Sequence, residues 1–344
     1  MLREAWMLAI ETLSWMELKG LNEKLALAKA SQQLGIEDVN ALGLAYRMVF
    51  ESVRKKNVID YLLNHILKER SISNFKLGVR AFLRLYAHEI HFEKIKYEEA
   101  VEIVRTGRAI LGWRELHNVE PFLGEIYTTN LKELIKGLKD KEKVSLQTYN
   151  PKWFVKYCYK AFGRKKALEI LEASKENPPV YIRVNTLRGE EEKILKRITS
   201  EHIRLRKVEG LNYTYMVLSS QKPLARTKSH QKGLFYIQDK ASCLASEVAS
   251  PEPKMKVLDV CAAPGAKTSF LAQLMENKGK IYSIDYSKRR MKVWMKEIKR
   301  MGVRNARPVI ADACNPLPVK AQADLVVLDP PCTCLLYTSP SPRD

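Results

Sequence analysis

Hydrophobic side chains in the first part of the chain recur every three or four positions, which is the spacing of an amphipathic helix. No alternating strand pattern interrupts these repeats, and Pro121 is the only proline before residue 138. Core packing explains the aromatic side chains on the predicted faces. We therefore predict an all-helical domain over residues 1–138. Two of its predicted faces comprise Leu42, Tyr46, Val49 and Val53, and Phe75, Val79, Phe82, Tyr86 and Ile90.

The pattern changes after a charged stretch, which ends this domain or links it to the next. A helix predicted after Pro151 carries Trp153, Phe154 and Tyr157 on one face. Shorter elements rich in Arg and Lys follow, and we predict a small α+β subdomain over residues 150–235. Its other predicted elements are a strand over 180–185, a helix over 190–199 and a strand over 213–218.

Strands alternate with helices in the next part of the chain, which we predict to be a third domain over residues 236–333. Alternation of this kind gives a parallel, doubly wound, Rossmann-like α/β sheet that binds ligands at the carboxyl ends of its strands. The sequence therefore predicts a multi-domain protein whose last sheet is incomplete at the C-terminus. The predicted strands are 256–260, 280–284, 307–310 and 323–328, and the predicted helices are 268–275 and 288–301.

Basic residues exceed acidic ones, with 59 Lys and Arg against 39 Asp and Glu and a net charge of +20. An excess of this size favours a polyanionic partner, nucleic acid above all. No apolar run approaches the roughly 18 residues that a membrane span needs, and the N-terminus lacks the anatomy of a signal peptide. We therefore expect a soluble, cytoplasmic, monomeric protein without membrane contact.

Six cysteines are present, and only Cys332 and Cys334 are close in sequence. A Cys-x-Cys pair alone is a poor zinc signature, so we expect no metal site. A cytoplasmic chain keeps its thiols reduced. They are therefore available for chemistry.

The sharpest motif is the stretch Asp259–Thr268, which joins a predicted strand to a predicted helix through small residues. Small side chains let a ligand approach the backbone, and a helix N-terminus offers free N–H groups. The stretch contains neither the Gly-x-Gly-x-x-Gly pattern of dinucleotide sites nor the Gly-x-x-x-x-Gly-Lys-Ser/Thr pattern of a P-loop. NAD or ATP binding through those motifs is therefore disfavoured.

Carboxylates recur at the ends of the strands that follow, at Asp285, Asp312 and Asp329. A carboxylate after the second strand is placed to accept hydrogen bonds from ribose hydroxyls, and one after the third could reach an adenine amino group. Asp329-Pro-Pro-Cys332 holds a carboxylate and a thiol in a stiffened loop. A lone cysteine is usually a small buried hydrophobe, but directly after Asp-Pro-Pro we favour a functional one.

Together these motifs make the chain resemble the RsmB/Nop/NSUN-type family of RNA cytosine-5 methyltransferases. The helical part resembles the NusB-type RNA-binding domain that precedes the catalytic domain in some members. The family match covers about 150 to 333. The matching pieces are Pro178–Leu187, Gln238–Ser242, Asp259–Thr268 and Asp329–Cys332.

The resemblance implies that S-adenosylmethionine is the methyl donor. It implies that Asp285 contacts the ribose, that Asp312 lies near the adenine and that Asp329 lies near the donor and the target base. It also makes residues 150–235 the family's small RNA-binding subdomain. The chain departs from the family at Ala266, where a second glycine is usual. The implied donor-binding loop comprises Cys261, Ala262, Ala263, Pro264, Gly265, Ala266 and Lys267.

The chemistry of the family requires a cysteine nucleophile, because carbon 5 of cytosine is too weak a nucleophile to take a methyl group unaided. A thiolate that adds to carbon 6 makes carbon 5 enamine-like, and Asp329 could hydrogen-bond the base near N3. By resemblance, Cys332 assists product release, whereas the attacking cysteine lies in a later Thr-Cys motif. Thr333-Cys334 follows Cys332 immediately, so we do not assign Cys334 as the nucleophile.

The last eleven residues, 334–344, look foreign to the family and match the translation of a common transposase sequencing adapter. We therefore predict a non-native tail there, and a natural chain that continues after about Thr333. On this interpretation the 344 residues lack the main nucleophile and have no methyl transfer activity.

Two alternatives stay open. One is a non-catalytic RNA-binding protein with a degenerate methyltransferase fold, which the intact loop after Asp259 argues against. The other is an amino-group methyltransferase, which often carries an aromatic residue where this chain has Cys332. The substrate we expect first is ribosomal RNA, and second transfer RNA, by family analogy alone.

Overall fold

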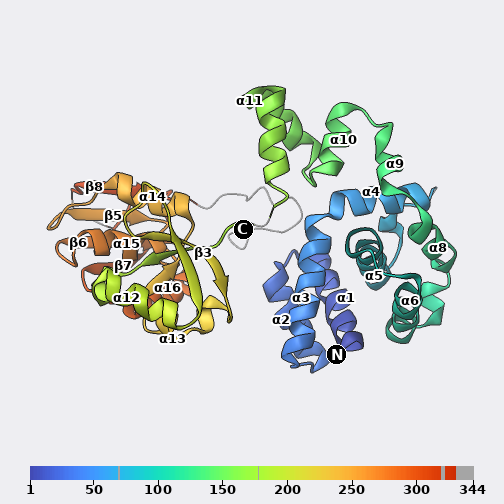
Figure 1. Cartoon of the computed structure of the whole chain (residues 1–344), viewed down its shortest axis with the longest axis horizontal. Coiled ribbons are helices and arrows are strands. Elements are labelled where there is room, and N and C mark those ends of the chain that lie inside the picture. The colour runs from blue at the N-terminus through green and yellow to red at the C-terminus, as the bar shows by residue number, and fades with distance from the viewer. Residues whose placement is uncertain (69, 177, 319–321, 331–344) are drawn as a thin grey trace. The chain divides into compact units, whose positions relative to one another are not determined.

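The computed structural model describes residues 1–68, 70–176, 178–318 and 322–330. They form two compact units, one within residues 1–176 and one within residues 178–330 (Figure 1). The predicted boundaries at 138, 150 and 235 stay predictions. Residues 331–344, which include Cys332 and the predicted tail, lie outside the described part.

Helices are the only regular secondary structure among the described residues of the first unit, which confirms the all-helical prediction for residues 1–138. The charged stretch before residue 144 is not a plain linker, because it lies in the short helices α9 and α10. The helices are α1 (Leu2–Lys19), α2 (Glu23–Leu34), α3 (Val39–Arg54), α4 (Lys56–Ile66), η1 (Ile72–Asn74), α5 (Leu77–His88), η2 (Glu89–Glu93), α6 (Tyr97–Leu111), α7 (Trp113–Leu116), α8 (Glu120–Thr128), α9 (Leu131–Lys136), α10 (Asp140–Gln147) and α11 (Lys152–Ala173).

Side-chain caps and an aromatic core define the helical unit. Asn22 and Asp38 accept backbone N–H groups at the starts of α2 and α3, as good N-cap residues do. The rings of Trp6 and Phe82 lie 5.9 Å apart in the core, and both are buried.

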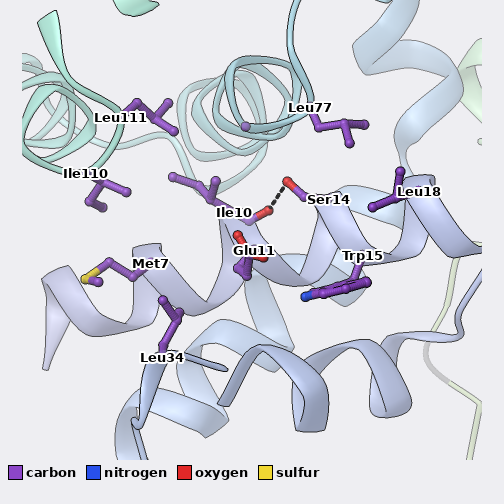
Figure 2. Close-up of a pocket in the computed structure, with 11 residues that line it drawn as sticks. Met7, Ile10, Glu11, Ser14, Trp15, Leu18, Leu34, Leu77, Ile110 and Leu111 are labelled. Carbon is purple, nitrogen blue, oxygen red and sulfur yellow. Dashed lines mark hydrogen bonds between the residues drawn. The ribbon is translucent and has the colours of Figure 1, made fainter. Parts of the chain in front are cut away.

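A cavity of about 410 Å³ opens beside Trp15 between α1, α2, α5 and α6, and Figure 2 shows its mainly apolar lining.

The second unit begins with a four-stranded antiparallel sheet in the order β2-β3-β1-β4. Helix α12 packs Ile194 and Ile198 against Ile182 and Phe235 of this sheet. The strands β2 and β4 were not predicted, because β2 is mostly charged and β4 is three residues long. The elements are β1 (Tyr181–Val184), η3 (Thr186–Arg188), α12 (Glu191–Ser200), β2 (Ile203–Lys207), β3 (Thr214–Ser220), η4 (Leu224–Arg226), α13 (Lys228–Gln231) and β4 (Phe235–Ile237).

The second unit continues with a four-stranded parallel sheet in the order β7-β6-β5-β8, which confirms the predicted Rossmann-like pattern. Trp294 and Met291 of α16 and Leu271 of α15 form its core with Val257 and Ile281 of the strands. Helix α14 precedes the sheet and was not predicted. The elements are α14 (Lys240–Ala249), β5 (Lys256–Val260), α15 (Ala266–Leu274), β6 (Lys280–Asp285), α16 (Lys288–Met301), β7 (Ala306–Ile310) and β8 (Leu325–Leu328).

The two sheets of this unit are joined by buried polar contacts. The Asn185 side-chain amide donates to the carbonyl oxygens of Gly233 and Met301, both at 2.8 Å. Gly233 has a φ of +71°, and a Cβ built there would lie 2.0 Å from the Arg300 carbonyl oxygen. The close approach of these two backbone segments therefore requires glycine. Within the described residues no helix has the length and apolar character needed to cross a bilayer.

We expect Gly233→Ala to lower the free energy of unfolding by about 2–5 kcal/mol, because it adds a clash to the strain of a left-handed residue. Gly210→Ala is the control: its φ is +77° and a Cβ meets nothing within 4 Å. The control should lose only about 1–2 kcal/mol. Urea unfolding of the full chain measures both, and equal losses would contradict the proposed close approach.

Candidate functional site

The loop between β5 and α15 is folded back on itself at the carboxyl edge of the parallel sheet. Cys261 has a φ of 65° and Gly265 a φ of 109°, and the Ala263–Pro264 peptide is cis. The Ala262 N–H donates to the Ile284 carbonyl at 2.9 Å, which ties the loop to β6. A Cβ on Gly265 would lie 3.2 Å from the Trp294 ring, so the loop and α16 are in close contact.

Asp285, predicted as the ribose ligand, is buried at the end of β6 and holds this loop. Its carboxylate accepts the Ala263 N–H at 3.2 Å and the Ser287 N–H at 3.1 Å. Arg290 Nη1 lies 3.2 Å from the Asp285 Oδ2 atom, and another nitrogen of Arg290 donates to the Ala263 carbonyl. Asp285 therefore fixes the loop through its own contacts.

Lys267 and Asp329 meet at the same edge of the sheet. Lys267 Nζ lies 2.6 Å from Asp329 Oδ2 and donates to the Ser242 hydroxyl at 3.0 Å. The Asp329 N–H lies 3.4 Å from the Val260 carbonyl oxygen, so Asp329 directly extends the β8 pairing with β5. The Lys267 side chain is 15% exposed and that of Asp329 is 44% exposed, which leaves the carboxylate accessible to a ligand.

A chain of hydrogen bonds runs from Lys267 into the antiparallel sheet. The Gln238 amide donates to the Ser242 hydroxyl at 3.2 Å, and Arg183 Nε donates to Gln238 Oε1 at 3.0 Å. Arg183 is fully buried, also donates to Ser269 at 2.8 Å, and stacks 4.5 Å from the Phe270 ring centroid. Burial lowers the pKa of Arg183 to about 10. The guanidinium is therefore held by neutral acceptors and a ring.

Sequence reasoning did not assign roles to Arg183, Gln238 or Ser242. All three lie in the pieces that resemble the family, Pro178–Leu187 and Gln238–Ser242. The family resemblance was therefore the only signal that could have identified these residues, because nothing in the local sequence pattern distinguishes Arg183 from other arginines in the region.

Asp259 forms a second buried network beneath the loop. Its carboxylate accepts the Thr268 hydroxyl, and the Thr268 oxygen accepts the Trp294 indole N–H at 3.0 Å. Burial raises the pKa of Asp259 to about 7, with smaller contributions from Asp329 and Asp285.

The pKa of the Cys261 thiol is also raised, first by burial and then by the charge of Asp285. The thiol is therefore not activated as a nucleophile.

The other predicted site residues are placed less centrally. Asp312 is exposed just after β7, where its carboxylate accepts the Cys314 N–H and the Asn315 amide, both at 3.0 Å. It stands at the same sheet edge as Asp285, since β6 and β7 are parallel. Cys332 lies outside the described residues. No group of three or more side chains that could hold a metal occurs in the part of the chain that the structure describes.

The site has the properties that S-adenosylmethionine requires. Ala262, Ala263 and Gly265 carry no bulky side chain, and the first N–H groups of α15 have no intrahelical acceptor. Arg290 Nη1 is buried and paired with Asp285, but no hydrogen bond aligns with its N–H groups among the described residues. Asp329 adds a partly exposed carboxylate at the same sheet edge, which suits the cationic donor. The residues present therefore fit the predicted cofactor.

Family models match two segments. Residues 247–342 match the 16S rRNA methyltransferase RsmB/F family, and residues 150–218 match the ferredoxin-like domain of RsmF/B-like methyltransferases. A probable ribosomal RNA small subunit methyltransferase B of Bacillus subtilis is 26% identical over 337 residues, which cover 95% of this chain and 73% of the relative. The match therefore includes the helical unit.

Other relatives match a smaller share of the chain. The tRNA (cytosine(72)-C(5))-methyltransferase of Pyrococcus horikoshii is 42% identical over 112 residues, 33% of this chain and 29% of the relative. A methyltransferase homologue from the same organism has a TM-score of 0.53 at 29% identity, covering 57% of this chain and 64% of that chain. The crystal structure of PH0851 shares the fold, with a TM-score of 0.74 at 23% identity over 98% of this chain and 76% of that chain.

The buried carboxyl of Asp259 predicts a pH dependence. Because its pKa is raised in the folded state, the folded protein keeps a proton that the unfolded chain has lost, and stability falls as pH rises through the window from about 4 to about 7. Asp259→Asn cannot titrate, so it should gain roughly 3 kcal/mol relative to the wild type between about pH 5 and about pH 8. Urea unfolding at several pH values tests this, and parallel stability curves for the two proteins would contradict it.

Proposed function

Because the chain belongs to the RsmB/F family of RNA cytosine-5 methyltransferases, we propose that its second unit binds S-adenosylmethionine and serves methylation of cytosine in RNA. The observation that carries the proposal is the meeting of three groups at one sheet edge. These groups are the loop after β5, the carboxylate of Asp285 and the Lys267–Asp329 pair. S-adenosylmethionine supplies an electrophilic methyl group when it is bound.

The residues of the loop would hold the donor, and each has a distinct task. Asp285 and Arg290 keep the loop in shape, and Arg290 Nη1 retains an unused N–H. Asp285 would contact the ribose and Asp312 would lie near the adenine, as the family resemblance implies. The backbone N–H groups at the start of α15 would receive the donor's carboxylate.

Asp329 is the side chain that we assign to the target base. Its Oδ2 atom is bound to Lys267, whereas its Oδ1 atom has no partner among the described residues. A carboxylate held on one side by an ammonium can accept a hydrogen bond on the other side from N3 of cytosine when that nitrogen is protonated. Lys267 is itself held by Ser242, so the carboxylate has a defined position.

The covalent step, a thiolate added to carbon 6, concerns residues outside the described part. Cys332 as the thiol that assists release, and a nucleophile in a later Thr-Cys motif, stay predictions. For the substrate we propose ribosomal RNA before transfer RNA, since the Bacillus relative that matches nearly the whole chain carries a small subunit rRNA name. We also propose that the helical unit is a NusB-like RNA-binding region.

Donor binding tests the proposal directly by calorimetry with S-adenosylmethionine. We expect Asp285→Asn to weaken binding at least tenfold, a free-energy loss of about 1.4 kcal/mol or more, because the amide cannot accept both backbone N–H groups and pair with Arg290. Glu192→Ala, an exposed carboxylate on α12, is the matched control and should bind like the wild type. An unchanged affinity of Asp285→Asn would remove Asp285 from the site, and no binding by the wild type would refute the donor assignment.

A further inference from the structure

Helix α11 buries one side and leaves the other exposed. Gly163 has a φ of 72° and a ψ of 162°, which interrupts the helix after Phe162. In the first half, Val155 and Cys158 are buried and pack in one cluster with Leu171 of the second half. Residues on the opposite side of the helix, which Figure 1 labels α11, are exposed.

Two large aromatic rings stand on the outward side. Trp153 and Tyr157 are 56% and 58% exposed and lie one turn apart. The half-buried ring of Phe154 supports both: its centroid is 5.7 Å from that of Trp153 and 6.4 Å from that of Tyr157, nearly parallel to the latter at 13°. Large exposed aromatic rings in a row are uncommon on a surface that has no partner.

The same side carries positive charge without compensation. Lys156 and Lys160 are exposed and also lie one turn apart. Neither has a carboxylate within salt-bridge distance among the described residues, whereas Lys152 lies 3.5 Å from Glu142 and Lys166 lies 2.9 Å from Glu169. At 100° per residue, Lys156, Lys160, Trp153 and Tyr157 fall within one arc of the helix.

We infer that this side of α11, defined by Trp153, Lys156, Tyr157 and Lys160, binds an unpaired RNA strand. Bases stack on exposed aromatic rings, and lysines between the rings bind the phosphates. The rings are about 6 Å apart along the helix axis, so successive nucleotides of an extended strand can each reach one. The inference rests on the proposed function and adds where the substrate is held.

A duplex is a poorer fit for this surface, because its base faces are already stacked. A protein partner that covers the rings would need carboxylates opposite two neighbouring ammonium groups, whereas every nucleotide of an RNA strand brings a phosphate. The combination of flat rings and unpaired lysines therefore favours single-stranded RNA over the other occupants.

The experiment is fluorescence anisotropy of the full chain with a labelled single-stranded oligoadenylate of about twelve nucleotides, and with a duplex of equal length. Trp153→Ala/Tyr157→Ala should bind the single strand at least tenfold more weakly, with little change for the duplex. The matched control is Trp113→Ala/Tyr97→Ala, since these rings of the same unit are 58% and 62% exposed. The control should bind both RNAs like the wild type.

Salt dependence separates the two kinds of contact. Lys156→Ala/Lys160→Ala should reduce the slope of log affinity against log salt by about 1.4, the value for two phosphates of a single strand. The aromatic variant should keep the wild-type slope. Trp153→Leu/Tyr157→Leu keeps apolar area but removes the flat rings, so it should bind the single strand as weakly as the alanine variant. It replaces the alanine variant in the test if that variant does not fold.

Each contrary outcome has a distinct meaning. Wild-type affinity of the folded aromatic variants would overturn the inference. An equal loss of affinity for the single strand and the duplex in these variants would also overturn it. A third contrary result is a changed scattering profile of the variants with unchanged RNA binding, which would indicate that the rings contact protein. If the wild-type chain binds S-adenosylmethionine but no RNA, the RNA-binding role of α11 is wrong and the donor site is unaffected. If it binds RNA through α11 but does not bind S-adenosylmethionine, the role of α11 is supported and the proposed function is wrong.

Discussion

The carboxylate of Asp285 is the contact on which the candidate site depends. It lies at the end of one strand and accepts N–H groups from the loop that follows the neighbouring strand and from the start of α16. The backbone between Cys261 and Gly265 contains two residues of positive φ. Besides Asp285, it is held by the Ala262–Ile284 and Arg290–Ala263 hydrogen bonds. The Asp285 carboxylate, together with the Ala262–Ile284 hydrogen bond, holds the loop against β6.

The Arg183 chain of hydrogen bonds extends this constraint into the antiparallel sheet. Through Gln238 and Ser242 it reaches Lys267, and through Ser269 it reaches the first turns of α15. A buried guanidinium without a carboxylate partner is costly to move, because each of its N–H groups would lose an acceptor inside the protein. The antiparallel sheet and the candidate site are therefore joined by one continuous network of buried polar contacts.

Sequence reasoning predicted the parallel sheet and the strand-end acids, since both follow from local periodicity and from the geometry of parallel strands. It also placed Asp285, Asp312 and Asp329 at one edge, which the described structure confirms. It did not find Arg183 or Ser242 as site residues, because their partners lie far along the chain. The strand β2 was missed since tertiary pairing with β3, rather than propensity, makes it a strand.

Trp294 gives the second unit a built-in optical probe. Four of the five tryptophans precede residue 178, so this indole alone reports on the methyltransferase unit. Its N–H is bonded to Thr268 and its ring contacts the glycine that begins α15. The emission of this one fluorophore should therefore follow the electrostatic environment of the loop, and it can be read in the full chain or in the second unit alone.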